Sequence, residues 1–170
     1  IRDEETAEVC VRAALTGHLV LATAHTNDAA TAAIRLVEMK VKPYLVASAL
    51  TLVIAQRQVR MICPHCKKQV PPDAQKLISF GFTPKFINEM EYYEGQGCSR
   101  CTFSGFKGRA AIYEVLNVNN GIREQIFRAK SAASIQKEAT ASGMTSLFKS
   151  ALKKVKTGVI TFDDALKVLY

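Results

Sequence analysis

The sequence lacks the features of a secreted or membrane-spanning protein. No run of about 18 or more apolar residues occurs, and the most apolar stretch, 44–55, is interrupted by Ser48 and Thr51. The first residues, Ile1–Glu5, have neither the basic start nor the apolar core of a signal peptide. They also lack an initiator methionine, so we expect the chain to be a piece of a longer protein.

A phosphate-binding loop is missing as well. The sequence contains no Gly-x-x-x-x-Gly-Lys-Ser/Thr motif, and the glycine-rich stretches 95–97 and 105–108 have neither its spacing nor its final Lys-Ser/Thr pair. Internal repeats and a heptad pattern are also absent. The chain by itself therefore offers no loop that cradles the phosphates of a nucleotide.

The composition is that of a globular protein with a basic excess. The hydrophobic content is 48%, the charged content is 22% and the net charge is +8, which suits one domain with a small appended subdomain. A basic cluster at helical spacing, which we expect to be a solvated helix face, consists of Lys149, Lys153, Lys154 and Lys156. A nucleic-acid or anionic-lipid partner is permitted by this charge but not required.

Helix caps and apolar periodicity predict an α/β order over the first 62 residues. Asp3 is placed to cap a helix over 4–16, and Pro43 to open another to about Leu50. The apolar run His18–Ala24 predicts a buried strand, followed by a polar loop and a helix over 29–39. With a second strand over 52–62, this order favours a parallel α/β sheet.

The remaining residues divide into two further regions. Residues 63–108 contain consecutive prolines, several glycines and short predicted helices at 73–80 and 84–90, which is typical of a small insert. A strand over 109–118 and helices that start at Asn119, Ser131, Thr145 and Thr161 follow. The predicted domains are therefore a partial core (1–62), an insert (63–108), and the end of the core with a helical tail (109–170).

Two Cys-x-x-Cys pairs predict one structural zinc site. Cys63 with Cys66, and Cys98 with Cys101, each place two sulfurs on a tight turn, from which both reach a tetrahedral metal at about 2.3 Å. Two reducible disulfides or four buried thiols are the alternatives, but a chain without secretion features is expected in a reducing compartment. A closed Cys₄ site has no open coordination position, so it contributes folding free energy and rigidity rather than chemistry.

Two other possible ligands have simpler explanations. His65 lies inside the first Cys-x-x-Cys pair and could replace a cysteine, but a full set of four cysteines predicts a solvent-facing turn residue. Cys10 is expected to be a small apolar residue on the first helix. The predicted metal ligands are therefore the four paired cysteines alone.

Several motifs, in matching order and spacing, resemble the secretion and pilus-assembly ATPases of bacteria. These motifs are Ile1–Ala7, Leu15–Val20, Thr23–Ala29, Gln56-Arg57, the two cysteine pairs, Gly105–Arg109, Ile112–Glu114, Gly143–Leu147 and Gly158–Thr161. The four-cysteine insert resembles the assembly branch of that family, which comprises type II secretion motors and type IV pilus extension motors, whereas retraction motors generally lack it. Residues 81–84 and 112–116 favour the pilus extension motor, and the type II secretion motor stays the alternative.

The resemblance implies an α/β fold, the second half of a RecA-like P-loop ATPase domain with a zinc-binding insert and a helical C-terminal tail. It also implies a cytoplasmic homohexamer, peripheral to the bacterial inner membrane, that uses Mg-ATP to act on a membrane platform protein and insert pilin subunits. The family's catalytic glutamate would lie immediately before Ile1. We therefore expect this chain alone to be inactive, and we expect no nucleic-acid partner.

The resemblance further implies a nucleotide sensor in the polar loop. His25 corresponds to the family's histidine box near the γ-phosphate, and it follows a predicted strand at the edge where α/β sheets bind ligands. An imidazole there can hydrogen-bond the phosphate or the attacking water, although capping or packing is the alternative. Thr26 and Asn27 share the loop and are expected to orient His25 at the nucleotide. Asn27 or Asp28 equally suits the role of helix N-cap.

Three arginines are further candidates. Arg2 lies beside the missing glutamate and can reach a phosphate or a carboxylate of the same site, with surface solvation as the alternative. Arg57, which follows Gln56 in the middle of an apolar strand, should meet a carboxylate, a carbonyl or another subunit. Arg109 lies near the second cysteine pair and is expected to anchor the insert to the main sheet.

A zinc-ribbon module that binds nucleic acid is the rival function. It would use the basic excess together with aromatic residues, which are Phe82, Phe86, Tyr92, Tyr93, Phe103 and Phe106. It predicts salt-sensitive binding to oligonucleotides, whereas the motor predicts binding to a platform protein and to neighbouring subunits.

Overall fold

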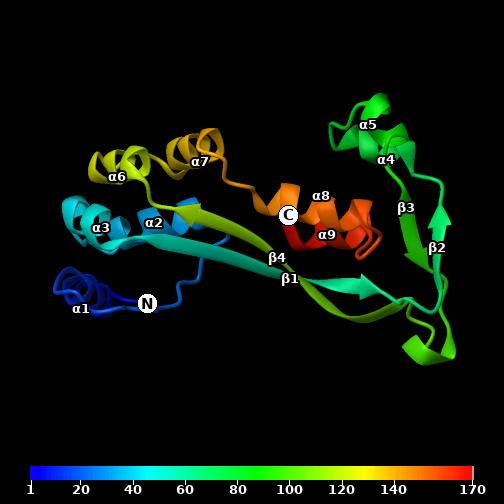
Figure 1. Cartoon of the computed structure of the whole chain (residues 1–170), viewed down its shortest axis with the longest axis horizontal. Coiled ribbons are helices and arrows are strands. Elements are labelled where there is room, and N and C mark those ends of the chain that lie inside the picture. The colour runs from blue at the N-terminus through cyan, green and yellow to red at the C-terminus, as the bar shows by residue number, and fades with distance from the viewer. Residues whose placement is uncertain (170) are drawn as a thin grey trace. The chain divides into compact units, whose positions relative to one another are not determined.

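The computed structural model describes residues 1–169, which form two compact units (Figure 1). Unit 1 comprises residues 1–56 and 113–146, and unit 2 comprises residues 57–112 and those from 147 onward. Two long strands, β1 (Leu52–Ile62) and β4 (Phe106–Asn117), pair with each other and contribute to both units. Their arrows point in opposite directions (Figure 1). The boundary between the two units falls within both strands, after Gln56 in β1 and after Ile112 in β4.

Unit 1 is built from five helices around a core of small and branched apolar side chains. The helices are α1 (Glu4–Leu15), α2 (Ala29–Glu38), α3 (Pro43–Ala49), α6 (Asn120–Phe127) and α7 (Ala132–Ala141). Helix α3 packs against α1 and α6, and α2 packs against α7. The first helix begins as predicted, since Asp3 accepts the backbone N–H of Thr6 at 2.8 Å. Asn119 and Ser131 likewise cap α6 and α7, so the predicted helices of this unit are confirmed.

The prediction of a strand over His18–Ala24 is wrong. The segment is extended but belongs to no sheet, and the side chains of Leu19 and Leu21 are 88% and 87% exposed. A strand needs a neighbour for its backbone N–H and C=O groups, and none of the strands within residues 1–169 pairs with this segment. For the same reason the expected parallel sheet within residues 1–62 does not form, because β1 is the single strand described there.

Unit 2 contains a β-hairpin, a three-residue 3-10 turn, η1 (Ser99–Cys101), and four short helices. Strands β2 (Lys67–Val70) and β3 (Tyr92–Gly95) pair antiparallel, with Lys67 opposite Gly95 and Val70 opposite Tyr92. Helices α4 (Ala74–Ser79) and α5 (Pro84–Asn88) lie between these strands in sequence, and α8 (Leu147–Lys156) and α9 (Phe162–Leu169) follow β4. The four-residue strands escape sequence analysis because neither shows a clear alternation of apolar and polar residues.

Aromatic rings form part of the interior of unit 2. The ring of Phe82 lies 5.1 Å from that of Phe86, 5.9 Å from that of Phe148 and 5.2 Å from that of Phe162. These rings come from the insert and from helices α8 and α9, so the two parts of the chain share one aromatic cluster.

No helix among residues 1–169 is both long enough and apolar enough to cross a membrane.

Asp164 is a buried carboxylate that ties α9 to β1. It is 5% exposed, and it accepts both the backbone N–H and the side-chain Nε of Arg60 at 3.1 Å. Burial works against its ionisation, but the hydrogen bonds and the charge of Arg60 lower the pKa of Asp164 below its usual value. The pair therefore stabilises the folded unit while the carboxylate is ionised.

We expect Asp164→Asn to lower the free energy of unfolding at neutral pH by about 1–3 kcal/mol, because the guanidinium loses its charged acceptor. The Arg60 side chain is 51% exposed, so solvent screening favours the lower end of this range. Since the folded pKa lies below the ordinary 3.8, the contribution is present above that value and is lost as the pH falls through the folded pKa. Urea unfolding at neutral and acidic pH measures both effects, and a loss that does not shrink in acid would contradict this origin.

Candidate functional site

Four sulfur atoms converge in unit 2. Cys63 follows β1 directly, Cys66 precedes β2, Cys98 is the residue before η1, and Cys101 is the last residue of η1. The four Sγ atoms lie within 4.8 Å of one another. The Cys63–Cys98, Cys66–Cys101 and Cys98–Cys101 Sγ atoms are 3.9, 3.8 and 3.7 Å apart. Tetrahedral zinc with sulfur at about 2.3 Å requires sulfurs about 3.8 Å apart, whereas a disulfide requires about 2.05 Å, so the group fits a zinc ion.

Glycines allow the two cysteine turns to approach each other. A Cβ atom on Gly95 would lie 2.0 Å from the carbonyl oxygen of Gly105, and Gly105 itself has φ +77°. The backbone N–H of Cys63 donates to that same carbonyl oxygen at 2.9 Å, and the N–H of Gln96 donates to the carbonyl of Cys66 at 3.0 Å. A side chain at Gly95 or Gly105 would therefore force the turns apart.

Backbone N–H groups also act on the sulfurs. The N–H of Cys98 donates to Sγ of Cys101 at 3.2 Å. Burial opposes ionisation of Cys101, but the N–H groups of Cys98 and Gly105 lower its pKa to about 6. Burial raises the pKa of Cys66 to about 12, against the effect of the N–H of Gly97. A bound divalent cation favours the thiolate form of all four cysteines, so these local differences matter least when a metal is present.

His65 and Cys10, which the sequence analysis rejected as metal ligands, lie outside the four-sulfur group. His65 is exposed, and its Nδ1 atom lies 3.0 Å from Nη1 of Arg100. Cys10 lies on α1 and is partly buried. The predictions of a solvent-facing His65 and of a helical Cys10 are both confirmed.

In unit 1, the structure brings Arg2 and His25 together. The Nε and Nη2 atoms of Arg2 lie 3.3 and 3.1 Å from Nε2 of His25, and both residues are exposed. A guanidinium has donors only, so Nε2 is the acceptor of this contact, and a neutral imidazole in this arrangement has its proton on Nδ1. The two residues that the sequence selects as catalytic candidates are thus direct neighbours.

The loop that carries His25 ends in a helix cap. Asp28 accepts the backbone N–H of Thr31 at 2.7 Å and its hydroxyl at 2.8 Å, so Asp28 rather than Asn27 is the N-cap of α2. The hydroxyl of Thr26 donates to the carbonyl oxygen of Asp28 at 3.2 Å. Thr26 thereby shapes the loop, while His25 and Asn27 stay exposed.

The other predicted residues lie on the paired strands. Gln56 is exposed and Arg57 is partly buried in the middle of β1. Nη1 of Arg109 on β4 lies 3.4 Å from Oε1 of Gln58 on β1, so this side chain contacts the neighbouring strand. Glu114, a fully buried carboxylate on β4, is not among the residues that the sequence selects. Its signal is a charged residue at an inward position of an alternating strand, between Ile112 and Leu116.

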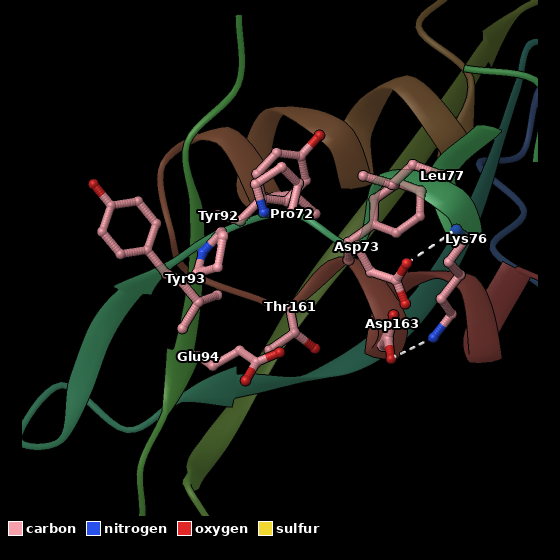
Figure 2. Close-up of a pocket in the computed structure, with 13 residues that line it drawn as sticks. Pro72, Asp73, Lys76, Leu77, Tyr92, Tyr93, Glu94, Thr161 and Asp163 are labelled. Atoms are coloured by element: carbon pink, nitrogen blue, oxygen red, sulfur yellow. Dashed lines mark hydrogen bonds and ion pairs between the residues drawn. The ribbon is translucent and has the colours of Figure 1, made fainter. Parts of the chain in front are cut away.

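Unit 2 also contains a pocket with a volume of about 150 Å³ (Figure 2). Its lining includes the carboxylates of Asp73, Glu94 and Asp163 and the ammonium group of Lys76, which bonds Asp163 at 2.6 Å. Tyr92 also lines the pocket, and its buried hydroxyl has no hydrogen-bond partner among the described residues. The pocket contains none of the predicted ATPase or metal residues.

Known proteins resemble this chain over nearly its whole length. The family of type II/IV secretion system proteins matches residues 1–167. The type IV pilus assembly ATPase PilB of Thermus thermophilus is 46% identical over 166 residues, which cover 98% of this chain and 19% of that protein. PilB of Myxococcus xanthus is 46% identical over 167 residues, covering 98% and 30%. The type II secretion system protein E of Pseudomonas aeruginosa is 39% identical over 168 residues, covering 99% and 33%.

Solved structures of related ATPases share the fold. The pilus retraction motor PilT with bound ADP matches with a TM-score of 0.63 and 25% identity. The match covers 98% of this chain and 37% of the PilT chain. The Legionella pneumophila ATPase DotB has a TM-score of 0.63 at 19% identity, covering 98% and 36%. The predicted α/β ATPase fold is thus confirmed. This chain spans between 19% and 33% of the length of the three curated relatives compared here, and it belongs to the family of type II/IV secretion system proteins.

Proposed function

We propose that this chain is the C-terminal part of an ATP-hydrolysing motor for type IV pilus assembly. The observation that carries the proposal is the 46% identity to two pilus assembly ATPases over 98% of the chain. Type II secretion is the alternative, since a type II secretion system protein E is 39% identical over 99% of the chain. Deleting the gene and scoring both surface pili and secreted proteins distinguishes the two processes, because each motor serves one of them.

His25 and Arg2 would serve the nucleotide site of the full-length protein. Mg-ATP supplies the phosphoryl group and the metal that neutralises its charge. With Nε2 turned to Arg2, the imidazole of His25 presents Nδ1–H as a donor for a phosphate oxygen or for the attacking water. Arg2 adds a fixed positive charge, and Thr26 and Asn27 orient the loop at the nucleotide.

Zinc is the metal that we propose for Cys63, Cys66, Cys98 and Cys101. The separations between sulfurs of 3.7–3.9 Å support zinc, and thiolates are among its preferred ligands. With all four positions taken by sulfur, the ion would supply folding free energy and rigidity to the hairpin and η1. The metal therefore has a structural role in this proposal.

The quaternary arrangement that we propose is a homohexamer at the cytoplasmic face of the inner membrane, peripheral to it and in contact with a membrane platform protein. Gln56 and Arg57 would contact a neighbouring subunit, and Arg109 would stabilise the pairing of β1 with β4. Size-exclusion chromatography with light scattering tests the hexamer in the full-length protein. Co-purification with the platform protein from detergent-solubilised membranes tests the partner.

The rival nucleic-acid function is disfavoured by the packing of its aromatic residues. Phe82 and Phe86 stack on each other, Tyr92 is buried, and Phe106 lies under the guanidinium of Arg60 at 4.1 Å. Phe103 is the one ring of the proposed set that is largely exposed, at 77%. A platform for stacked bases needs several exposed rings along a groove, so these residues serve the fold instead.

We expect purified residues 1–170 to show no ATP hydrolysis above background, because the sequence contains no phosphate-binding loop. The full-length protein should hydrolyse ATP in a Mg²⁺-dependent manner. A coupled assay of released phosphate measures both proteins side by side. Mg²⁺-dependent turnover by residues 1–170 would contradict the prediction, and an inactive full-length protein would contradict the proposed function.

A further inference from the structure

Glu114 is a carboxylate in the interior of unit 1, and it connects three elements. It lies on β4 and is 2% exposed. Its Oε1 atom accepts the backbone N–H of Ala29, the first residue of α2, at 3.0 Å. Its Oε2 atom accepts Nε2 of Gln136 on α7 at 3.2 Å. One buried side chain on β4 thus holds both α2 and α7.

Both of these partners donate hydrogen bonds, which suits an ionised carboxylate. A buried charge is costly unless hydrogen bonds compensate it, and each Glu114 oxygen has a donor. The negative charge also lies at the N-terminus of the ten-residue helix α2, where the helix dipole favours an anion. The position therefore selects a group that accepts at both oxygens.

The orientation of the Gln136 amide is the one that lets it donate to the carboxylate of Glu114. Its Nε2 atom faces Glu114, and its buried Oε1 atom has no hydrogen-bond partner among the described residues. Turning the amide over would place its oxygen against the carboxylate, which is worse than an unpaired carbonyl. Unit 1 therefore tolerates one unsatisfied acceptor so that the carboxylate keeps its donor.

The bond to Ala29 lies one residue beyond the loop that carries His25. Asp28 caps α2 through Thr31, while Glu114 holds the N–H of Ala29, so two carboxylates fix the first turn of the helix. Ala29 is 0% exposed, and the four residues before it are the loop His25–Asp28. The place at which α2 begins is therefore joined to His25 by a loop of only a few residues.

We propose that Glu114 is a positioning residue for the nucleotide-sensing loop: from the interior of unit 1 it fixes the start of α2, and thereby holds His25 against Arg2. The inference rests on the proposed function, since it assigns the loop a role in ATP turnover. Glu114 touches neither the nucleotide nor the reacting atoms in this proposal. It acts through the backbone of Ala29, and its acceptor oxygen matters more than its charge.

The test compares Glu114→Ala, Glu114→Gln and His25→Ala in the full-length protein, singly and as the Glu114→Ala/His25→Ala double variant. Glu114→Ala should lower kcat about tenfold with KM unchanged, because a small displacement of a catalytic group from its geometry is costly. Glu114→Gln should keep at least about half of kcat, since its carbonyl still accepts from Ala29 and Gln136 can turn its amide to accept from the new one. The double variant should be within about twofold of His25→Ala alone, because residues that act as a unit are not additive.

Asp164→Ala is the matched control, because it removes a buried carboxylate from unit 2 and lowers stability without touching this loop. Its effect on kcat, if any, should multiply with that of His25→Ala. All rates are measured well below the melting temperature of each variant. Glu114→Ala with wild-type kcat, multiplicative effects of Glu114→Ala and His25→Ala, or a Glu114→Gln variant as slow as Glu114→Ala would each overturn the proposal.

Two further measurements keep the outcomes distinct. If Glu114→Ala does not fold, Gln136→Met takes its place in the cycle with His25→Ala, and additive effects of that pair count against the proposal. Hydrogen exchange at Ala29 in the full-length protein is a readout without nucleotide, and it should be faster in Glu114→Ala than in wild type. A wild-type protein without turnover would refute the proposed function, whereas unchanged exchange at Ala29 would refute the positioning role.

Discussion

Replacing Cys63 or Cys98 by serine is expected to release the metal and to unfold the hairpin of unit 2. A serine hydroxyl is a poor zinc ligand, and structural zinc contributes about 10–16 kcal/mol of apparent binding free energy in zinc-finger peptides at neutral pH. The aromatic cluster with α8 and α9 supports the part of the insert around α4 and α5, so the loss of structure is expected chiefly in β2, β3 and η1, which carry or adjoin the four cysteines. We therefore expect a drop from one zinc per chain to nearly none, with faster hydrogen exchange chiefly in these three elements.

Metal content by atomic emission and exchange by mass spectrometry measure these effects. Cys10→Ser is the matched control, because Cys10 lies on α1 outside the four-sulfur group and its variant should keep one zinc per chain. In cells, Cys63→Ser in the full-length protein should reduce pilus assembly. A zinc-free variant that assembles pili normally would remove the proposed role of the metal.

His25→Ala in the full-length protein is expected to lower ATP turnover by about 100-fold while nucleotide affinity stays within about twofold, because a donor aimed at developing charge acts mainly in the transition state. The reason lies in the geometry of the pair, since Arg2 occupies Nε2 and leaves Nδ1–H as the donor. Steady-state kinetics and binding of a fluorescent nucleotide measure the two quantities separately.

His18 provides the matched control for His25. It is an exposed histidine of the same unit, and its Nδ1 atom lies 3.1 Å from the hydroxyl of Thr16 at the end of α1. His18→Ala should leave turnover within about twofold of wild type, as expected for a surface substitution away from special features. Equal turnover of His25→Ala and His18→Ala would show that His25 serves packing or the loop rather than catalysis.

Local signals predicted most helices and both long strands correctly. Asp3, Asn119 and Ser131 cap the helices that the sequence assigns to them, and β1 spans the predicted residues 52–62. These features depend on side chains that bond their own neighbouring backbone or on a periodic apolar face, and both are readable from one segment. Strand 18–24 was predicted wrongly because a strand needs a partner elsewhere in the chain.

In the candidate sites, too, features set by local spacing were predictable from the sequence and contacts between distant residues were not. The cysteine spacing identified all four sulfurs, because each Cys-x-x-Cys turn prearranges its own pair of ligands. The pairing of Arg2 with His25, the choice of Asp28 over Asn27 as the cap, and the three-way role of Glu114 were not readable from sequence spacing. These contacts join residues far apart in the chain or decide between adjacent candidates.

The sequence by itself therefore determined the family and the four cysteines whose sulfurs converge. Only the tertiary structure decided that a carboxylate 85 residues beyond Ala29 fixes the start of α2. The physical reason is that a buried charge is tolerated only where donors from separate elements meet, and such a meeting depends on how the chain folds back on itself.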